Sequence, residues 1–100
     1  MNYQPSDYPY PSEDYEASVL DGEMILFSSK TEKALYLNAP SKMILELCNG
    51  ELSVTEIINL LLESYPEASD ELEADVNVTF ENLFEGGAIL FSHSPVNITA

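Results

Sequence analysis

Apolar and polar residues follow a strand-like pattern in the first part of the chain and a helical spacing in the second part. Two short apolar runs, residues 19–20 and 23–28, are separated by Asp21 and Gly22. This dipeptide fits the two positive-φ positions of a tight hairpin turn. Residues 33–37 form a third run of alternating character. The pattern predicts a three-stranded antiparallel sheet, which needs a helical cover to be stable.

Three helices are predicted after these strands. The first covers about residues 40–48, with Asn38 or Ser41 as its N-cap and Gly50 as its stop signal. The second covers residues 53–64 and begins with a capping box. The third covers residues 70–85. The apolar positions of the last two helices recur at helical spacing and are expected to face the core: Val54, Ile57, Ile58, Leu61, Leu62, Leu72, Val76, Phe80 and Leu83.

The order of elements predicts one small α+β domain with a winged-helix-like layout, a three-stranded antiparallel sheet followed by three helices. We place this domain at residues 17–92, with residues 88–91 as an apolar return against the core. Residues 1–16 contain four tyrosines, three prolines and four acids. This composition predicts a flexible tail. Residues 93–100 are expected to form a frayed C-terminus.

The charge balance excludes two classes of partner. The chain has 3 basic and 18 acidic side chains and a net charge of −15, and no Lys or Arg follows Lys42. Such a chain repels phosphate backbones and anionic lipid headgroups, so neither nucleic acid nor membrane is expected as a partner. We expect a soluble, cytoplasmic protein.

Residues that could carry catalysis do not cluster in the sequence. His93 is the single histidine, and Cys48 is the single cysteine and fits the apolar face of the first helix. No serine or cysteine has a histidine and an acid arranged around it, and no acidic segment has the spacing of a calcium loop. We therefore expect no enzyme activity, no metal site and no cofactor.

A surface for polypeptide is the remaining hypothesis. If residues 33–37 form an edge strand, an extended peptide could pair with this strand and place alternate side chains beside the last helix. Edge strands also invite strand exchange, so a homodimer is a further possibility. The alternative function is an acidic scaffold or regulatory interaction domain that docks a basic partner.

The sequence resembles the PqqD family, the pyrroloquinoline quinone biosynthesis protein D family, over about residues 17–91. The resemblance depends on the order and spacing of several short motifs: Leu37-Asn38, Asn49-Gly50, Ser53-Val54-Thr55-Glu56-Ile57, Asp75-Val76, Thr79-Phe80, Leu83 and Gly87-Ala88-Ile89.

This resemblance implies a non-catalytic chaperone that binds the leader of a ribosomally made precursor peptide and presents it to a modifying enzyme, often a radical S-adenosylmethionine protein. In the family the leader adds to the third strand, in a groove closed by the third helix. The corresponding peptide-binding residues are Lys33, Ala34, Leu35, Tyr36, Leu37, Asp75, Val76, Thr79, Phe80 and Leu83. Phe80 and Leu83 also fit the predicted core.

The tail adds one hypothesis to these. Tyr8-Pro9-Tyr10-Pro11 has a Tyr-x-x-Pro spacing, which is similar to the leader motif that lasso-peptide recognition elements of this superfamily bind. The motif could therefore occupy the groove of its own domain, or that of a neighbouring copy, when no precursor is present.

Overall fold

The computed structural model describes residues 3–96, without the side chains of residues 68–70. Its strands are β1 (Tyr8–Pro11), β2 (Glu16–Leu20), β3 (Glu23–Ser28), β4 (Lys33–Leu37) and β5 (Ile89–Ser92). Its helices are α1 (Ala39–Leu47), α2 (Val54–Ser64) and α3 (Ser69–Glu85), with a single 3₁₀ turn, η1 (Pro66–Ala68), before α3. This order confirms the predicted α+β, winged-helix-like fold of an antiparallel sheet followed by three helices.

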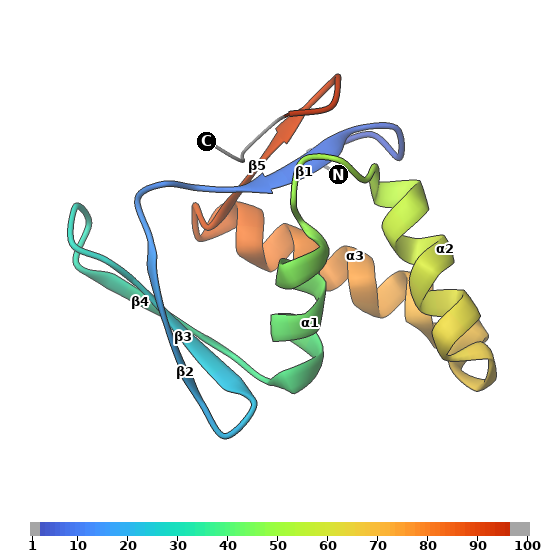
Figure 1. The fold of residues 1–100 in the computed structure, drawn as a ribbon, viewed down its shortest axis with the longest axis horizontal. Coiled ribbons are helices and arrows are strands. Elements are labelled where there is room, and N and C mark those ends of the chain that lie inside the picture. The colour runs from blue at the N-terminus through green and yellow to red at the C-terminus, as the bar shows by residue number, and fades with distance from the viewer. Residues whose placement is uncertain (1–2, 97–100) are drawn as a thin grey trace.

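Strands β2, β3 and β4 form an antiparallel sheet in that order, on one side of the helices (Figure 1). The β2–β3 hairpin turns at Asp21 and Gly22, whose φ angles are 52° and 82°. Positive φ at both central residues is the requirement of a type I′ turn. The hairpin predicted from Asp21-Gly22 is therefore confirmed, and its two-residue turn sets the register of β2 against β3.

Side-chain caps begin the first two helices where the sequence indicated. The Asn38 Oδ1 atom accepts a hydrogen bond from the Ser41 amide at 3.0 Å, so Asn38 is the N-cap of α1. At α2 the Ser53 hydroxyl accepts from the Glu56 amide at 3.2 Å, and the Glu56 carboxylate accepts from the Ser53 amide at 3.0 Å. This reciprocal pair is the predicted capping box.

The C-terminus of α3 is closed by a Schellman motif. The Ala88 amide donates to the Leu83 carbonyl at 2.8 Å, and the Gly87 amide donates to the Phe84 carbonyl at 3.0 Å. Gly87 has a φ of 78°, a backbone conformation that favours glycine. The chain therefore reverses at this point and leads directly into β5.

The core lies between the inner face of the sheet and the three helices. Its fully buried side chains include Ile57 of α2, Val76, Phe80 and Leu83 of α3, and Ile89 of β5. The buried Cys48 thiol donates to the Ile44 carbonyl, and burial raises the pKa of this thiol to about 12. Cys48 is thus a packed core residue, as its position in the sequence predicts.

The predicted flexible tail is wrong for the described residues 3–16. Strand β1 pairs antiparallel with β5, with Tyr8 opposite Ser92 and Pro11 opposite Ile89 (Figure 1). Tyr3 is buried, and its ring stacks on Phe91 with the centroids 4.5 Å apart. Aromatic packing supplies the apolar burial that aliphatic residues would otherwise provide.

The expectation of a frayed C-terminus is also wrong for residues 93–96. The Val96 amide donates to the Gly50 carbonyl at 2.7 Å, and His93 Nδ1 lies 2.9 Å from Asp7 Oδ1. Residues 97–100 lie outside the described part of the chain. No helix in the described part is long and apolar enough to cross a membrane.

Candidate functional site: the edge of β4 and the face of α3

Strand β4 is an outer strand of the sheet, and its register shows which backbone groups face outward. Leu20 and Glu23 flank the two-residue turn and therefore form a hydrogen-bonded pair. Alternation along the ladder then directs the amide and carbonyl groups of Leu35 and Leu37 toward β3. The corresponding groups of Ala34 and Tyr36 face the free edge. These two residues hold the backbone groups that an added strand would use.

Helix α3 presents one face to this edge. Asp75, Thr79, Asn82 and Gly86 follow each other at spacings of four, three and four, so they lie along one side of the helix. Thr79 is half-buried, and its hydroxyl donates to the Asp75 carbonyl at 3.0 Å. Asp75 and Asn82 are exposed. This side of α3 is therefore polar and only partly buried.

A hollow of about 110 Å³ separates β4 from this face of α3. We call it the β4–α3 groove. The residues that line it are Leu35, Tyr36, Leu37, Ser41, Thr79, Asn82 and Leu83. Leu35, Leu37 and Leu83 give it an apolar floor, and Ser41, Thr79 and Asn82 give it hydrogen-bonding walls. Such a mixture suits an extended backbone that carries an apolar side chain.

The chain comes close to β4 directly after α3. A Cβ atom added to Gly86 would lie 2.7 Å from Leu35 Cδ1, so the Leu35 side chain would have to shift to admit a larger residue here. The Tyr15 hydroxyl donates to the Gly86 carbonyl and secures this end of the helix. Leu37 and Ser41 line the groove toward the start of α1.

The ten site residues predicted from the sequence fall into three environments. Leu35, Tyr36, Leu37, Thr79 and Leu83 line the groove. Lys33, Ala34 and Asp75 are exposed beside it, on β4 and α3. Val76 and Phe80 are both 0% exposed and lie in the core, where they support α3 from behind. The structure thus brings the strand and the helix together and assigns these two apolar residues to packing.

Ser41, Asn82 and Gly86 were not among the residues predicted from the sequence. Asn82 and Gly86 continue the helical spacing of Asp75 and Thr79, and this spacing could have identified them. The sequence indicates Ser41 only as a candidate N-cap. Its place in the groove depends on how α1 folds back after β4, which the local pattern does not show.

Tyr36 is also held on the outer face of the sheet. Its hydroxyl donates to the Glu23 carboxylate, and this hydrogen bond raises the pKa of the Tyr36 phenol. The ring is 61% exposed and lies opposite Ile25 of β3. Tyr36 therefore contributes its backbone to the groove more than its ring.

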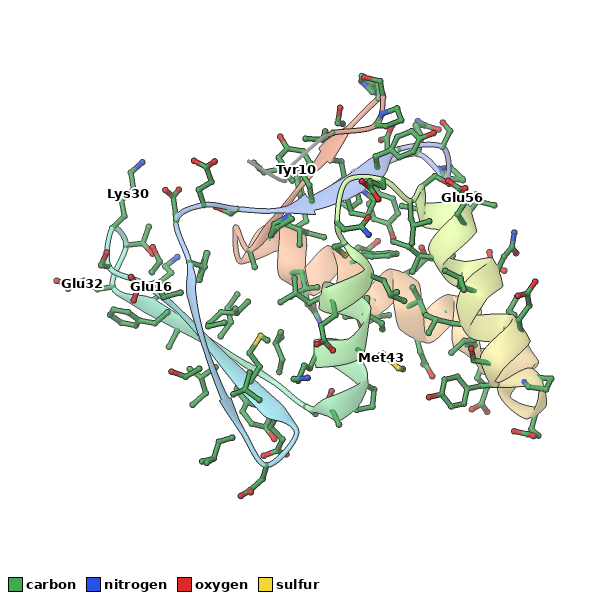
Figure 2. The ribbon with its side chains drawn as sticks, in the orientation of Figure 1. Tyr10, Glu16, Lys30, Glu32, Met43 and Glu56 are labelled. Carbon is green, nitrogen blue, oxygen red and sulfur yellow. The ribbon has the colours of Figure 1, made fainter. Side chains whose placement is uncertain are left out.

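The hypothesis that Tyr8-Pro9-Tyr10-Pro11 fills the groove of its own domain is wrong. These residues are β1, and they pair with β5 on the other side of α3 from β4 (Figure 1). Pro9 is fully buried there, and Tyr10 lies on the β1 ribbon away from the sheet that contains β4 (Figure 2). The β4 edge is unpaired within the described residues.

Comparisons with known proteins agree with this architecture. A family model described as coenzyme PQQ synthesis protein D (PqqD) matches residues 23–89. A solved structure described as "TbiB1 in Complex with the TbiA(beta) Leader Peptide" has a TM-score of 0.68 and 19% sequence identity, over 80% of this chain and 93% of that chain. At this identity the likeness establishes a shared fold. A search of curated protein sequences found no match.

Proposed function

Since this chain belongs to the PqqD family, we propose that it is a non-catalytic chaperone that binds the leader of a ribosomally synthesised precursor peptide by strand addition to β4. The observation that carries the proposal is the β4–α3 groove. An unpaired strand edge and a lined hollow lie side by side, along the strand and helix that the family resemblance indicated.

In this proposal the backbone of β4 and the side chains of the groove have different roles. The outward amide and carbonyl groups of Ala34 and Tyr36 supply main-chain hydrogen bonds, which give affinity to many sequences. Peptide side chains on the inner side enter the groove between Leu37 and Thr79, and the shape of this groove gives sequence preference. Peptide-binding residues in this proposal are Leu35, Tyr36, Leu37, Thr79 and Leu83, with Lys33, Ala34 and Asp75 flanking them.

The β2 edge provides an internal comparison. It is the other outer strand of the sheet, and each of its residues is exposed. The residues that line the β4–α3 groove come from β4, α1 and α3, and none comes from β2. Both edges offer backbone groups, but β4 also has a helix along it, so we assign peptide binding to β4.

The likeness to the TbiB1 complex supports the same role, because that protein was solved with a leader peptide. We further propose that the bound leader is presented to a modifying enzyme such as a radical S-adenosylmethionine protein. Binding and presentation require no acid, base or nucleophile of this chain, in agreement with the scattered positions of His93 and Cys48.

The proposal is tested by removing one outward amide from each edge. Proline has no amide hydrogen and is tolerated on edge strands. Ala34→Pro deletes a donor at the β4 edge, and Ala17→Pro deletes the equivalent outward donor of β2. We expect Ala34→Pro to weaken binding by more than about tenfold and Ala17→Pro to leave it unchanged, since each main-chain bond to a ligand contributes roughly 0.5–1.5 kcal/mol and the ring adds steric exclusion.

Binding is measured by isothermal titration with synthetic peptides encoded by short reading frames beside the gene. A second pair of variants fills the groove: Thr79→Trp places a large ring inside it, and Val78→Trp places the same ring on the neighbouring, 55% exposed position of α3. Only Thr79→Trp should block binding. Equal affinities for all four variants, with folds intact by circular dichroism, would refute binding at β4.

A further inference from the structure

A second and larger hollow lies past the end of β4. It has a volume of about 670 Å³ and lies where the start of α1 faces the corner between α2 and α3. We call it the apolar basin. Its apolar lining residues are Ala39, Pro40, Met43, Tyr65 and Leu72. Figure 2 shows Met43 projecting from α1 toward that corner. A volume of this size is typical of sites that bind small ligands or large side chains.

The chemistry of the lining favours an aromatic or other large apolar side chain. The Tyr65 hydroxyl lies 3.7 Å from the Met43 sulfur, and the Tyr65 side chain is 44% exposed. Methionine sulfur is polarisable and adapts to the shape of an aromatic partner. An exposed tyrosine beside a methionine therefore gives a deformable apolar surface that an incoming ring can cover.

The rim of the basin is acidic. Glu67 and Glu71 line it, both are exposed, and no lysine is among its lining residues. In a chain with a net charge of −15, such a rim attracts Lys or Arg and repels acidic segments. The charge of the rim therefore favours a ligand that has Lys or Arg next to its apolar side chain.

The basin lies beyond the β4–α3 groove along both β4 and α3. Leu37 lines the groove as the last residue of β4, and Ala39, two positions later, lines the basin. Along α3, Thr79 of the groove and Leu72 of the basin are about two turns, or about 10 Å, apart. An extended peptide covers this distance in about three residues. A peptide paired with β4 that continues past Leu37 therefore arrives at the basin.

We propose that the apolar basin binds one large apolar side chain of the leader peptide, carried about three residues beyond the strand-paired segment and flanked by Lys or Arg. This inference rests on the proposed function and adds a specificity determinant to it. The strand edge accepts many backbones, whereas the basin distinguishes a basic, aromatic-containing leader from other peptides.

The basin can be tested by itself with a tripeptide too short to form a strand, acetyl-Lys-Trp-Lys-amide. The protein has no tryptophan, so all tryptophan fluorescence comes from the peptide, and its change reports binding. In ¹⁵N-labelled protein we expect the amides of Ala39, Met43 and Leu72 to shift on titration, and those of Leu35 and Tyr36 to stay in place. Acetyl-Glu-Trp-Glu-amide should bind at least about fivefold more weakly, because the acidic rim repels it.

Variants separate the contribution of apolar contacts to tripeptide affinity from the contribution of the rim charges. Ala39→Phe fills the basin and should weaken tripeptide binding by at least about fivefold. Glu67→Gln with Glu71→Gln removes the rim charges and should weaken it by about fivefold. The matched control, Glu51→Gln with Glu63→Gln, changes the net charge equally at exposed positions outside the basin and should leave affinity within about twofold.

Amide shifts centred on Leu35 and Tyr36 would overturn the basin site. Shifts spread over the acidic surface would also overturn it, if the control pair of Glu51→Gln with Glu63→Gln abolishes them as fully as the rim pair does. The leader peptide gives the decisive comparison. If Ala34→Pro abolishes leader binding and Ala39→Phe leaves it unchanged, the proposed function stands and the basin inference fails. If the tripeptide binds in the basin and no leader peptide binds the domain, both fail as an account of leader recognition. Weakening of leader binding by both variants supports both.

Discussion

Asp7 is a single residue that ties the two ends of the described chain together. Its carboxylate is buried, accepts a hydrogen bond from the Gln4 amide at 2.9 Å, and pairs with His93 Nδ1 at 2.9 Å. Its own carbonyl accepts from the Val54 amide at the start of α2. The Gln4 hydrogen bond is the main reason that the pKa of Asp7 lies below its ordinary value, and the contact with His93 lowers it further.

We predict that Asp7→Ala lowers the free energy of unfolding by about 1–2 kcal/mol at neutral pH, because the Gln4 amide loses its charged acceptor. A lowered native pKa means that the folded state binds the proton less tightly than the unfolded state. The contribution is therefore complete above the unfolded pKa of about 3.9 and disappears as the pH falls through the lower native pKa.

Urea denaturation of wild type and Asp7→Ala from neutral to acidic pH checks this prediction. Asp14→Ala is the control, since Asp14 is exposed and its carboxylate makes no hydrogen bond among the described residues. The difference between wild type and Asp7→Ala should shrink toward low pH. A difference that grows on acidification would contradict the assignment.

Among the elements, β1 shows most clearly how packing overrides local pattern. Two of its four residues are prolines, which argue against a strand. Pairing with only β5 leaves the other edge of β1 free of ladder bonds, so prolines are tolerated there. No local signal could show that Tyr3 would find Phe80 and Phe91, because these rings are at the other end of the sequence.

Tyr3 should therefore contribute strongly to stability. Its ring is 6% exposed, and its hydroxyl donates to Asn77 Oδ1 of α3 at 2.6 Å. We predict that Tyr3→Ala costs about 3 kcal/mol, equivalent to a decrease in Tm of roughly 12–24 °C for a domain of this size. Tyr3→Phe keeps the stacking and should cost only about 1 kcal/mol. Thermal unfolding followed by circular dichroism measures both, and equal Tm values for Tyr3→Ala and wild type would show that the N-terminal segment does not hold the core.

Elements with strong local signals were predictable from the sequence. The Asp21-Gly22 turn and the Ser53–Glu56 capping box depend on a few neighbouring residues, and both formed as expected. The candidate site was predictable only in outline. The alternation in β4 identified the strand, but only the register shows that Ala34 and Tyr36, and not Leu35, direct their backbone groups outward. The helical stripe of Val76 and Phe80 indicated a buried face without showing which neighbouring face borders the groove.

Over the whole molecule, uncompensated negative charge opposes folding. Among the described residues, the ion pairs are Lys42–Glu46 at 3.2 Å and the contact of Asp7 with His93. Most acids therefore repel each other across the surface without a partner. Salt screens this repulsion over about 10 Å at moderate ionic strength.

We predict that Tm rises by roughly 5 °C between very low salt and about 0.5 M sodium chloride. Differential scanning calorimetry at fixed pH measures the change. Sucrose at matched osmolality is the control for effects that do not depend on charge. A Tm that falls with added salt would mean that attractive ion pairs outweigh the repulsion.

The pairing of β1 with β5 also has a consequence for biosynthesis. On the ribosome β1 is made before every other described element, and its partner is made after all of them. The N-terminal segment must therefore wait, unpaired, while the helices emerge, and the long sequence separation slows this closure. We therefore expect the pairing of β5 with β1 to form late and to complete the packing of Tyr3 against Phe91.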